Sequence, residues 1–111
     1  MKLKNVKPEL QEFIKKHTEL FPKELIEIIL FGSYARNEQR VGSDVDLALV
    51  FHNSMIATPK LRAEIREILD NFCDTLELNL FCTDSKAIQT TSDKFDANYW
   101  IREEGFSLWA R

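Results

Sequence analysis

The chain has 111 residues, 44% of them hydrophobic and 30% charged, with a formal net charge of −3. This length predicts a single domain, residues 1–111, with a hydrophobic core of its own. The acidic balance argues against a dedicated nucleic-acid surface, which would normally be basic. No apolar run approaches the roughly 20 residues that span a membrane, and the basic N-terminal end is unlike a signal peptide. We therefore expect a cytoplasmic protein that does not contact the membrane.

The first half of the chain predicts a helix followed by two strands. Apolar residues recur at helical spacing in residues 1–22, and the helix is expected to begin near Pro8 and to stop at Pro22. The apolar run Leu25–Phe31 predicts a buried strand, and Val45–Phe51 predicts a second one. A polar connection of ten residues, 34–43, lies between Gly32-Ser33 and the second strand.

The second half predicts two further helices and two further strands. In chain order these are a helix from Thr58-Pro59 to Phe72, a strand over Leu76–Phe81, a helix over Ser92–Glu104 that Gly105 closes, and an edge strand over Phe106–Trp109. The order predicts an α/β (α+β) fold, a small mixed β-sheet with helices packed on it. Three aromatic residues near the C-terminal end are interpreted as core residues in preference to a partner surface: Tyr99, Trp100 and Trp109.

Asp44 and Asp46 are the first candidate site residues. They stand at positions i and i+2 at the start of the second strand, so their carboxylates share one face. Two carboxylates placed together repel each other, and a bound Mg²⁺ would remove the repulsion. Two such ions can hold the attacking and leaving oxygens of a phosphoryl transfer. An Asp-x-Asp pattern is common, however, and is weak evidence when taken alone.

Gly32 and Ser33 strengthen this interpretation. A strand that ends in Gly-Ser and turns into a short helix presents backbone N–H groups that favour phosphate. Gly32 lets the backbone approach closely, and Ser33 adds a hydroxyl. The alternative is an ordinary turn at the end of a strand. Neighbouring strands would bring this turn and the aspartates to one edge of the sheet.

Glu77 and Arg36 complete the candidate set. Glu77 lies on the polar face of the third strand and is predicted to be a third carboxylate at the metal site, able to accept a proton from an attacking hydroxyl. Asn79 shares that face and could complete the metal site in place of Glu77. A solvent-facing Glu77 is the other alternative. Arg36 is predicted to help bind the nucleotide phosphates, as Arg40 could also do, although plain solvated charges explain both equally well.

The segment from Gly32 to Leu49 reads GSYARNEQRVGSDVDLAL and resembles the nucleotidyltransferase superfamily of the DNA polymerase β type, in particular its minimal members. The family signature is Gly-Ser, ten residues, then Asp-x-Asp, and this spacing is matched here. Leu76-Glu77-Leu78 resembles the family's later acidic strand, and Glu104-Gly105 its closing segment. The resemblance implies a polymerase β-like fold with a catalytic core over residues 25–109. Many relatives have Gly at Asn37, and Asn also tolerates left-handed backbone.

The resemblance implies roles for these residues. Asp44, Asp46 and Glu77 would be the catalytic carboxylates and bind Mg²⁺, with two ions expected, while Gly32 and Ser33 would bind the β- and γ-phosphates of ATP. A hydroxyl would attack the α-phosphate and release pyrophosphate. Minimal members are commonly paired with a helical HEPN-domain protein in toxin–antitoxin modules, which implies transfer of AMP to such a partner.

Two other functions stay open at this point. One is a non-catalytic nucleotide-binding antitoxin module, and the other is the catalytic subunit of a small-molecule nucleotidyltransferase of the aminoglycoside type. The chain leaves little room for a separate acceptor-binding domain, so we expect another protein to supply the acceptor or the surface that holds it.

Overall fold

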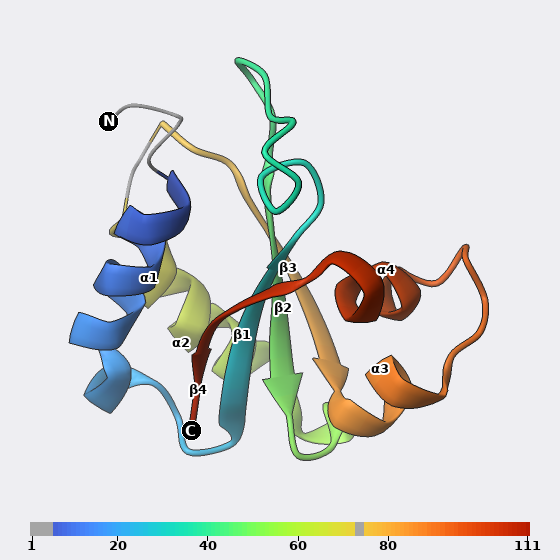
Figure 1. Ribbon diagram of the computed structural model, residues 1–111. Helices are drawn as coiled ribbons and strands as arrows, with labels where there is room; N and C mark the ends of the chain where they lie inside the picture. The colour runs from blue at the N-terminus through green and yellow to red at the C-terminus, as the bar shows by residue number, and fades with distance from the viewer. Residues whose placement is uncertain (1–5, 73–74) are drawn as a thin grey trace.

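The computed structural model describes residues 6–72 and 75–111, in which helices pack on both sides of a single sheet (Figure 1). The first half of the chain contains α1 (Val6–Lys16), a 3-10 helix (Thr18–Leu20), β1 (Leu25–Phe31), β2 (Val45–Phe51) and a second 3-10 helix (Ser54–Ile56). The second half contains α2 (Pro59–Asp70), β3 (Leu78–Asp84), α3 (Ser85–Thr90), α4 (Ala97–Glu104) and β4 (Phe106–Ala110).

The four strands form a mixed sheet in the order β3-β2-β1-β4. β1 runs antiparallel to both β2 and β4, whereas β2 and β3 are parallel. The parallel pair needs a crossover connection, and α2 lies in that connection. The predicted fold class, a small mixed sheet with helices packed on it, is confirmed.

β2 is buried on both faces because helices cover both sides of the sheet. Its residues Val45, Leu47, Leu49 and Phe51 belong to the larger hydrophobic cluster, which includes the buried residues of α1 and α2. Ala48 and Val50 point the other way, into a smaller cluster with Ile101 of α4. Figure 1 shows the two helix pairs on opposite sides of the sheet. Alternation along β2 therefore places Asp46 on the same face as α4.

The N-terminal helix ends earlier than predicted. α1 stops at Lys16 and a 3-10 helix follows, because the Thr18 hydroxyl donates to the carbonyl oxygens of Ile14 and Lys15 at 3.3 and 3.0 Å. Such side-chain bonds compete with continuation of the helix. The predicted continuous helix up to Pro22 is wrong, and residues 1–5 of the predicted segment lie outside the described residues.

Three elements of the second half also differ in their bounds from the prediction, and the first is α2, which ends at Asp70, not at Phe72. β3 begins at Leu78, not at Leu76, and runs on to Asp84 because each residue of Val45–Phe51 pairs with one residue of β3. The predicted helix over 92–104 is α4 alone, beginning after Asp96, whose carboxylate accepts a hydrogen bond from the Asn98 amide at 2.9 Å. α3 was not predicted. The edge strand near the C-terminal end is confirmed.

The C-terminal aromatic residues occupy different environments. Trp109 is buried and packs against Phe21, with ring centroids 5.5 Å apart, so its predicted core position is confirmed. Tyr99 is half-buried. Trp100 is 41% exposed, and the predicted core position is wrong for it. Within the described part of the chain, every helix is too short or too polar to cross a membrane.

Candidate functional site

The register of β1 and β2 brings Gly32 against Asp46. Phe31 pairs with Asp46 across the two strands, and Gly32 follows Phe31 with a φ of +77°. A Cβ atom at position 32 would lie 2.2 Å from Oδ2 of Asp46. Glycine is therefore required both by the left-handed backbone and by the carboxylate beside it. The predicted meeting of the Gly-Ser turn with the aspartates is confirmed for this pair.

Asp44 and Asp46 converge on the side-chain amide of Asn79. Nδ2 of Asn79 donates to Oδ2 of Asp44 at 3.1 Å and to Oδ1 of Asp46 at 3.2 Å. Asn79 stands opposite Asp46 in the parallel pair of β2 and β3. Since one NH₂ group has two protons, it satisfies one oxygen of each carboxylate. The two aspartates share a face, as the i, i+2 spacing predicts.

Glu77 lies at the same edge of the sheet, one residue before β3. Its carbonyl oxygen accepts a hydrogen bond from the Val45 amide at 2.8 Å, and its exposed side chain lines a pocket of about 300 Å³ together with Ser43 and Asp44. Within residues 6–72 and 75–111, the side chains of Asp, Glu, His and Cys form no group of three that could hold a metal ion. The backbone thus brings Glu77 to the site, while its role as a third ligand stays a prediction.

Gly32-Ser33 opens a tight turn that is closed by its own hydrogen bonds. The amides of Ala35 and Arg36 donate to the Gly32 carbonyl at 3.1 and 3.2 Å, and the Glu38 amide donates to the Ser33 carbonyl at 2.9 Å. The segment is a turn, so the predicted short helix is wrong. Asn37 has a φ of 58°, which confirms the prediction that asparagine can supply the left-handed backbone here. Phosphate binding by the turn stays a prediction.

Arg36 lies beside this turn, but two carboxylates already contact its guanidinium. Nη1 donates to Glu104 at 2.8 Å and Nε donates to Glu38 at 2.9 Å. The hydrogen bond with Glu104 is the main reason that the pKa of Arg36 is raised above its ordinary value. A phosphate that reached this permanently positive group would have to compete with these partners. Arg40 is exposed, and its backbone amide donates to the Ser43 hydroxyl at 2.9 Å.

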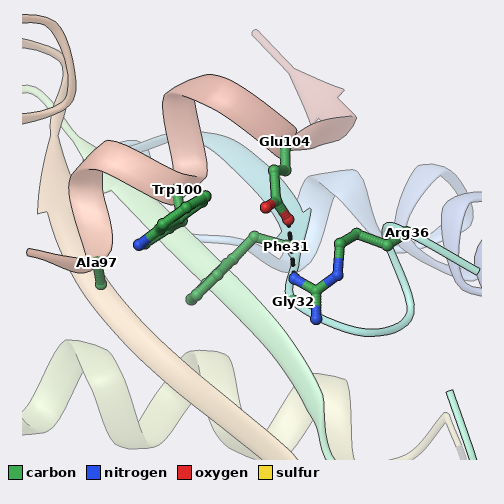
Figure 2. Close-up of a pocket in the computed structure, with 6 residues that line it drawn as sticks. All are labelled: Phe31, Gly32, Arg36, Ala97, Trp100 and Glu104. Atoms are coloured by element: carbon green, nitrogen blue, oxygen red, sulfur yellow. Dashed lines mark hydrogen bonds and ion pairs between the residues drawn. The ribbon is translucent and has the colours of Figure 1, made fainter. Parts of the chain in front are cut away.

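A pocket of about 340 Å³ opens between the end of β1 and α4 (Figure 2). Its lining combines apolar and charged side chains with one glycine: Phe31, Gly32, Arg36, Ala97, Trp100 and Glu104. In Figure 2 the Trp100 and Glu104 side chains project from α4, and Arg36 meets Glu104 at one end. Because Gly32 also touches Asp46, the pocket adjoins the acidic pair.

Sequence reasoning did not identify several residues of this region. Asn79 was predicted to share a face with Glu77 and was an alternative to Glu77 for completing the metal site, but nothing in the sequence showed that it bridges the aspartates. Lys7 of α1 reaches the turn and donates to the Ala35 carbonyl at 3.2 Å, from 28 positions away. Trp100 and Glu104 reach the site through the path of α4. The one available signal was their spacing of four residues, which places both on the same side of a helix.

The acidic pair fits a magnesium ion by its chemistry. Mg²⁺ prefers oxygen ligands, usually one or two carboxylates with waters and substrate phosphates. Asp44 is exposed and Asp46 is half-buried, so both can be reached from solvent. The Asn79 amide places its protons between the two carboxylates, where a cation would relieve the same repulsion. One ion therefore suits these residues, and the second ion stays a prediction.

Comparison with known proteins gives the family. The model of the polymerase β nucleotidyltransferase family matches residues 8–93, which include the Gly-Ser turn, the acidic pair and Asn79. A Methanocaldococcus jannaschii protein, MJ1305, whose name gives protein adenylyltransferase as its inferred activity, is 43% identical over 60 residues. That match covers 54% of this chain and only 38% of the relative.

Solved structures agree in fold. A toxin–antitoxin crystal structure with AMP-PNP superposes with a TM-score of 0.61 and 21% identity, over 95% of this chain and 73% of that chain. A tri-AMPylated Shewanella oneidensis HEPN toxin in complex with an MNT antitoxin gives a TM-score of 0.54 and 22% identity, over 92% and 73%. At these identities the likeness concerns the fold alone. The family match, which covers most of the chain, shows that this protein belongs to the polymerase β nucleotidyltransferase family.

Proposed function

We propose that this protein transfers AMP from ATP to a hydroxyl group of a HEPN-type partner protein, with Mg²⁺ held by Asp44 and Asp46. The observation that carries the proposal is the contact between the acidic pair and the Gly-Ser turn, where a Cβ on Gly32 would meet the Asp46 carboxylate at 2.2 Å. A triphosphate that lies along this turn brings its α-phosphate next to the carboxylates.

In this proposal each residue has a defined task. Gly32 and Ser33 bind the β- and γ-phosphates, and Arg36 neutralises them after exchanging a carboxylate partner for phosphate. When bound, Mg²⁺ supplies positive charge to the phosphate oxygens and orients them. The acceptor oxygen forms a bond to the α-phosphorus as the bond to the bridging oxygen breaks, and pyrophosphate leaves. Glu77, at the same edge, accepts the hydroxyl proton.

The partner class rests on the solved relatives. One of these structures is a complex of an AMPylated HEPN toxin with an MNT antitoxin, and another toxin–antitoxin structure contains AMP-PNP. We extend both features to this chain: ATP is the nucleotide, and a HEPN-type protein provides the acceptor hydroxyl. The name of the M. jannaschii relative, which also describes transfer of AMP to protein, supports the same chemistry.

The test is AMP transfer in the presence of a purified HEPN-type partner. With ATP labelled on the α-phosphate, the wild-type protein should label the partner only when Mg²⁺ is present. Asp44→Asn and Asp46→Asn should each lower the rate by about a hundredfold or more, because each removes a carboxylate that holds the Mg²⁺ ion which neutralises the phosphate. Asp70→Asn is the matched control, since Asp70 lies on α2 and pairs with Arg66 at 3.7 Å. Undiminished labelling by both site variants would contradict the proposal.

One observation favours a second candidate function. The amide of Asn79 occupies the space between the aspartates, and no third acidic side chain of the described residues joins them. A non-catalytic antitoxin would need no more than this. It predicts that the Asp44→Asn, Asp46→Asn double variant still neutralises the partner's toxicity in cells, whereas a transferase predicts that neutralisation is lost. Transfer to an aminoglycoside in place of protein would identify the small-molecule alternative.

A further inference from the structure

We propose that the pocket between β1 and α4 binds the nucleobase, and that Trp100 is the residue that stacks on it. This inference rests on the proposed function, since it requires a nucleotide whose phosphates lie at the Gly-Ser turn. Trp100 itself lies beyond the family match, which ends at residue 93, before α4 begins at Ala97.

Position is the first argument. The pocket shares Gly32 with the candidate phosphate site, and its lining residue Phe31 pairs with Asp46 in the sheet. The pocket and the acidic pair therefore lie side by side on the same face of the sheet. A nucleotide with its α-phosphate at Asp46 has its ribose and base within reach of α4.

Surface chemistry is the second argument. Phe31, Ala97 and Trp100 make one part of the lining apolar, and Trp100 leaves 41% of its surface exposed. The indole ring is held in place, because Nε1 donates to the Lys94 carbonyl at 2.8 Å and Tyr99 packs edge-on at 5.0 Å between ring centroids. An exposed aromatic face that is already oriented suits a planar base, whereas an apolar wall does not suit phosphate.

The charged end of the pocket gives the direction of binding. Arg36 and Glu104 meet at 2.8 Å on the side of the turn, away from Trp100 in Figure 2. The cation therefore lies near the expected phosphates, and the aromatic ring lies farther along the pocket. This order matches a nucleotide, which has charge at one end and a flat apolar surface at the other.

The test compares two ligands that differ in the base. Binding of a non-hydrolysable ATP analogue and of inorganic tripolyphosphate is measured by calorimetry with Mg²⁺. Trp100→Ala should weaken binding of the analogue by about tenfold to a hundredfold, while affinity for tripolyphosphate stays within about twofold. Trp100→Phe should retain most of the affinity for the analogue. Phe95→Ala is the matched control, since Phe95 is a fully exposed aromatic residue that does not line the pocket.

Three results would overturn the inference. The first is unchanged affinity of Trp100→Ala for the analogue, and the second is an equal loss of its affinity for the analogue and for tripolyphosphate. The third is a raised KM of Trp100→Ala for the protein partner while its affinity for the nucleotide is unchanged. The last would assign the pocket to the partner. Failure of the proposed function looks different: wild-type protein would bind the analogue in a Trp100-dependent way but transfer no AMP. Active transfer that ignores Trp100 would reject this inference alone.

Discussion

Asn79 shows how a single neutral side chain can organise a charged site. Its amide donates to both aspartates, at 3.1 and 3.2 Å, from a strand that lies parallel to theirs. Each carboxylate keeps another oxygen for other ligands. A divalent cation and the amide protons relieve the same repulsion, so we expect their stabilising effects to overlap.

Asn79→Ala should therefore lower the stability of the metal-free protein by about 0.5–1 kcal/mol, because exposed hydrogen bonds to carboxylates contribute modestly. Added Mg²⁺ should recover most of this loss, so Mg²⁺ should raise the Tm of the variant more than that of wild type. Thermal unfolding in EDTA and in MgCl₂ measures both. Asn71→Ala is the control: it removes a hydrogen bond to the Glu67 carbonyl on α2 and should respond to Mg²⁺ as wild type does. An equal Mg²⁺ effect on wild type and Asn79→Ala would contradict this account.

At the residue scale, the sequence predicted the glycine and the aspartates of the site but not the side-chain contacts that connect them to other elements. Asp44 and Asp46 were identified from their i, i+2 spacing in a strand, and Gly32 from the Gly-Ser turn and its match to the family signature. The bridging role of Asn79 depends on the parallel register of β2 and β3, which a pattern of alternating residues does not specify. The pairing of Arg36 with Glu104 joins residues 68 positions apart and depends on the path of α4.

α3 begins at an N-cap residue, Asp84, that also contacts another element. The Asp84 carboxylate accepts hydrogen bonds from the Ala87 amide at 2.8 Å and the Ser54 amide at 3.0 Å. Asp84 therefore caps α3 and also connects the end of β3 to the 3-10 helix that follows β2. The Ala87 hydrogen bond is the main reason that the pKa of Asp84 is lowered.

Asp84→Ala should cost about 1 kcal/mol of unfolding free energy at neutral pH, as for other N-caps. A lowered pKa in the folded state means that the charged form stabilises the fold. That contribution is fully present above the unfolded pKa of about 3.9 and is lost as pH falls through the folded value. The difference between wild type and Asp84→Ala should thus shrink in acid. Urea unfolding at neutral and acidic pH measures it, with Asp84→Asn as a control that keeps a capping oxygen. A difference that is constant with pH would be evidence against this role.

At the element scale, the periodicity of apolar residues predicted the buried strands and α2. It did not predict the helix ends that are set by hydrogen bonds from side chains. Thr18 ends α1 early through its bonds to helix carbonyls. The predicted helix over 92–104 merged residues before the Asp96 cap with α4, because Ser and Asp at 92–96 were compatible with an N-terminal extension. α3 is only six residues long, too short for a helical period to be recognised.

The whole molecule is asymmetric about its sheet. The larger cluster joins α1 and α2 to the sheet, with Ile65 and Leu69 fully buried, whereas only Ile101 of α4 enters the smaller cluster as a buried residue. The Thr83 hydroxyl of β3 donates a hydrogen bond to the side-chain oxygen of buried Asn98 on α4. The candidate site thus lies on the less extensively packed face. Such regions open locally at lower free energy than the core.

Hydrogen exchange should report this asymmetry. Amides of α4 should exchange about tenfold faster than those of α2, because opening α4 exposes less buried apolar surface. Ile101→Ala should accelerate exchange in α4 while leaving α2 nearly unchanged, whereas Ile65→Ala should destabilise the whole molecule, since it removes part of the larger cluster.

Addition of Mg²⁺ and a non-hydrolysable ATP analogue should slow exchange in α4, because the proposed base pocket uses Trp100 and Glu104. Equal protection of α2 and α4 in the free protein would show that both faces open together, and the site would then lie on a face as rigid as the core.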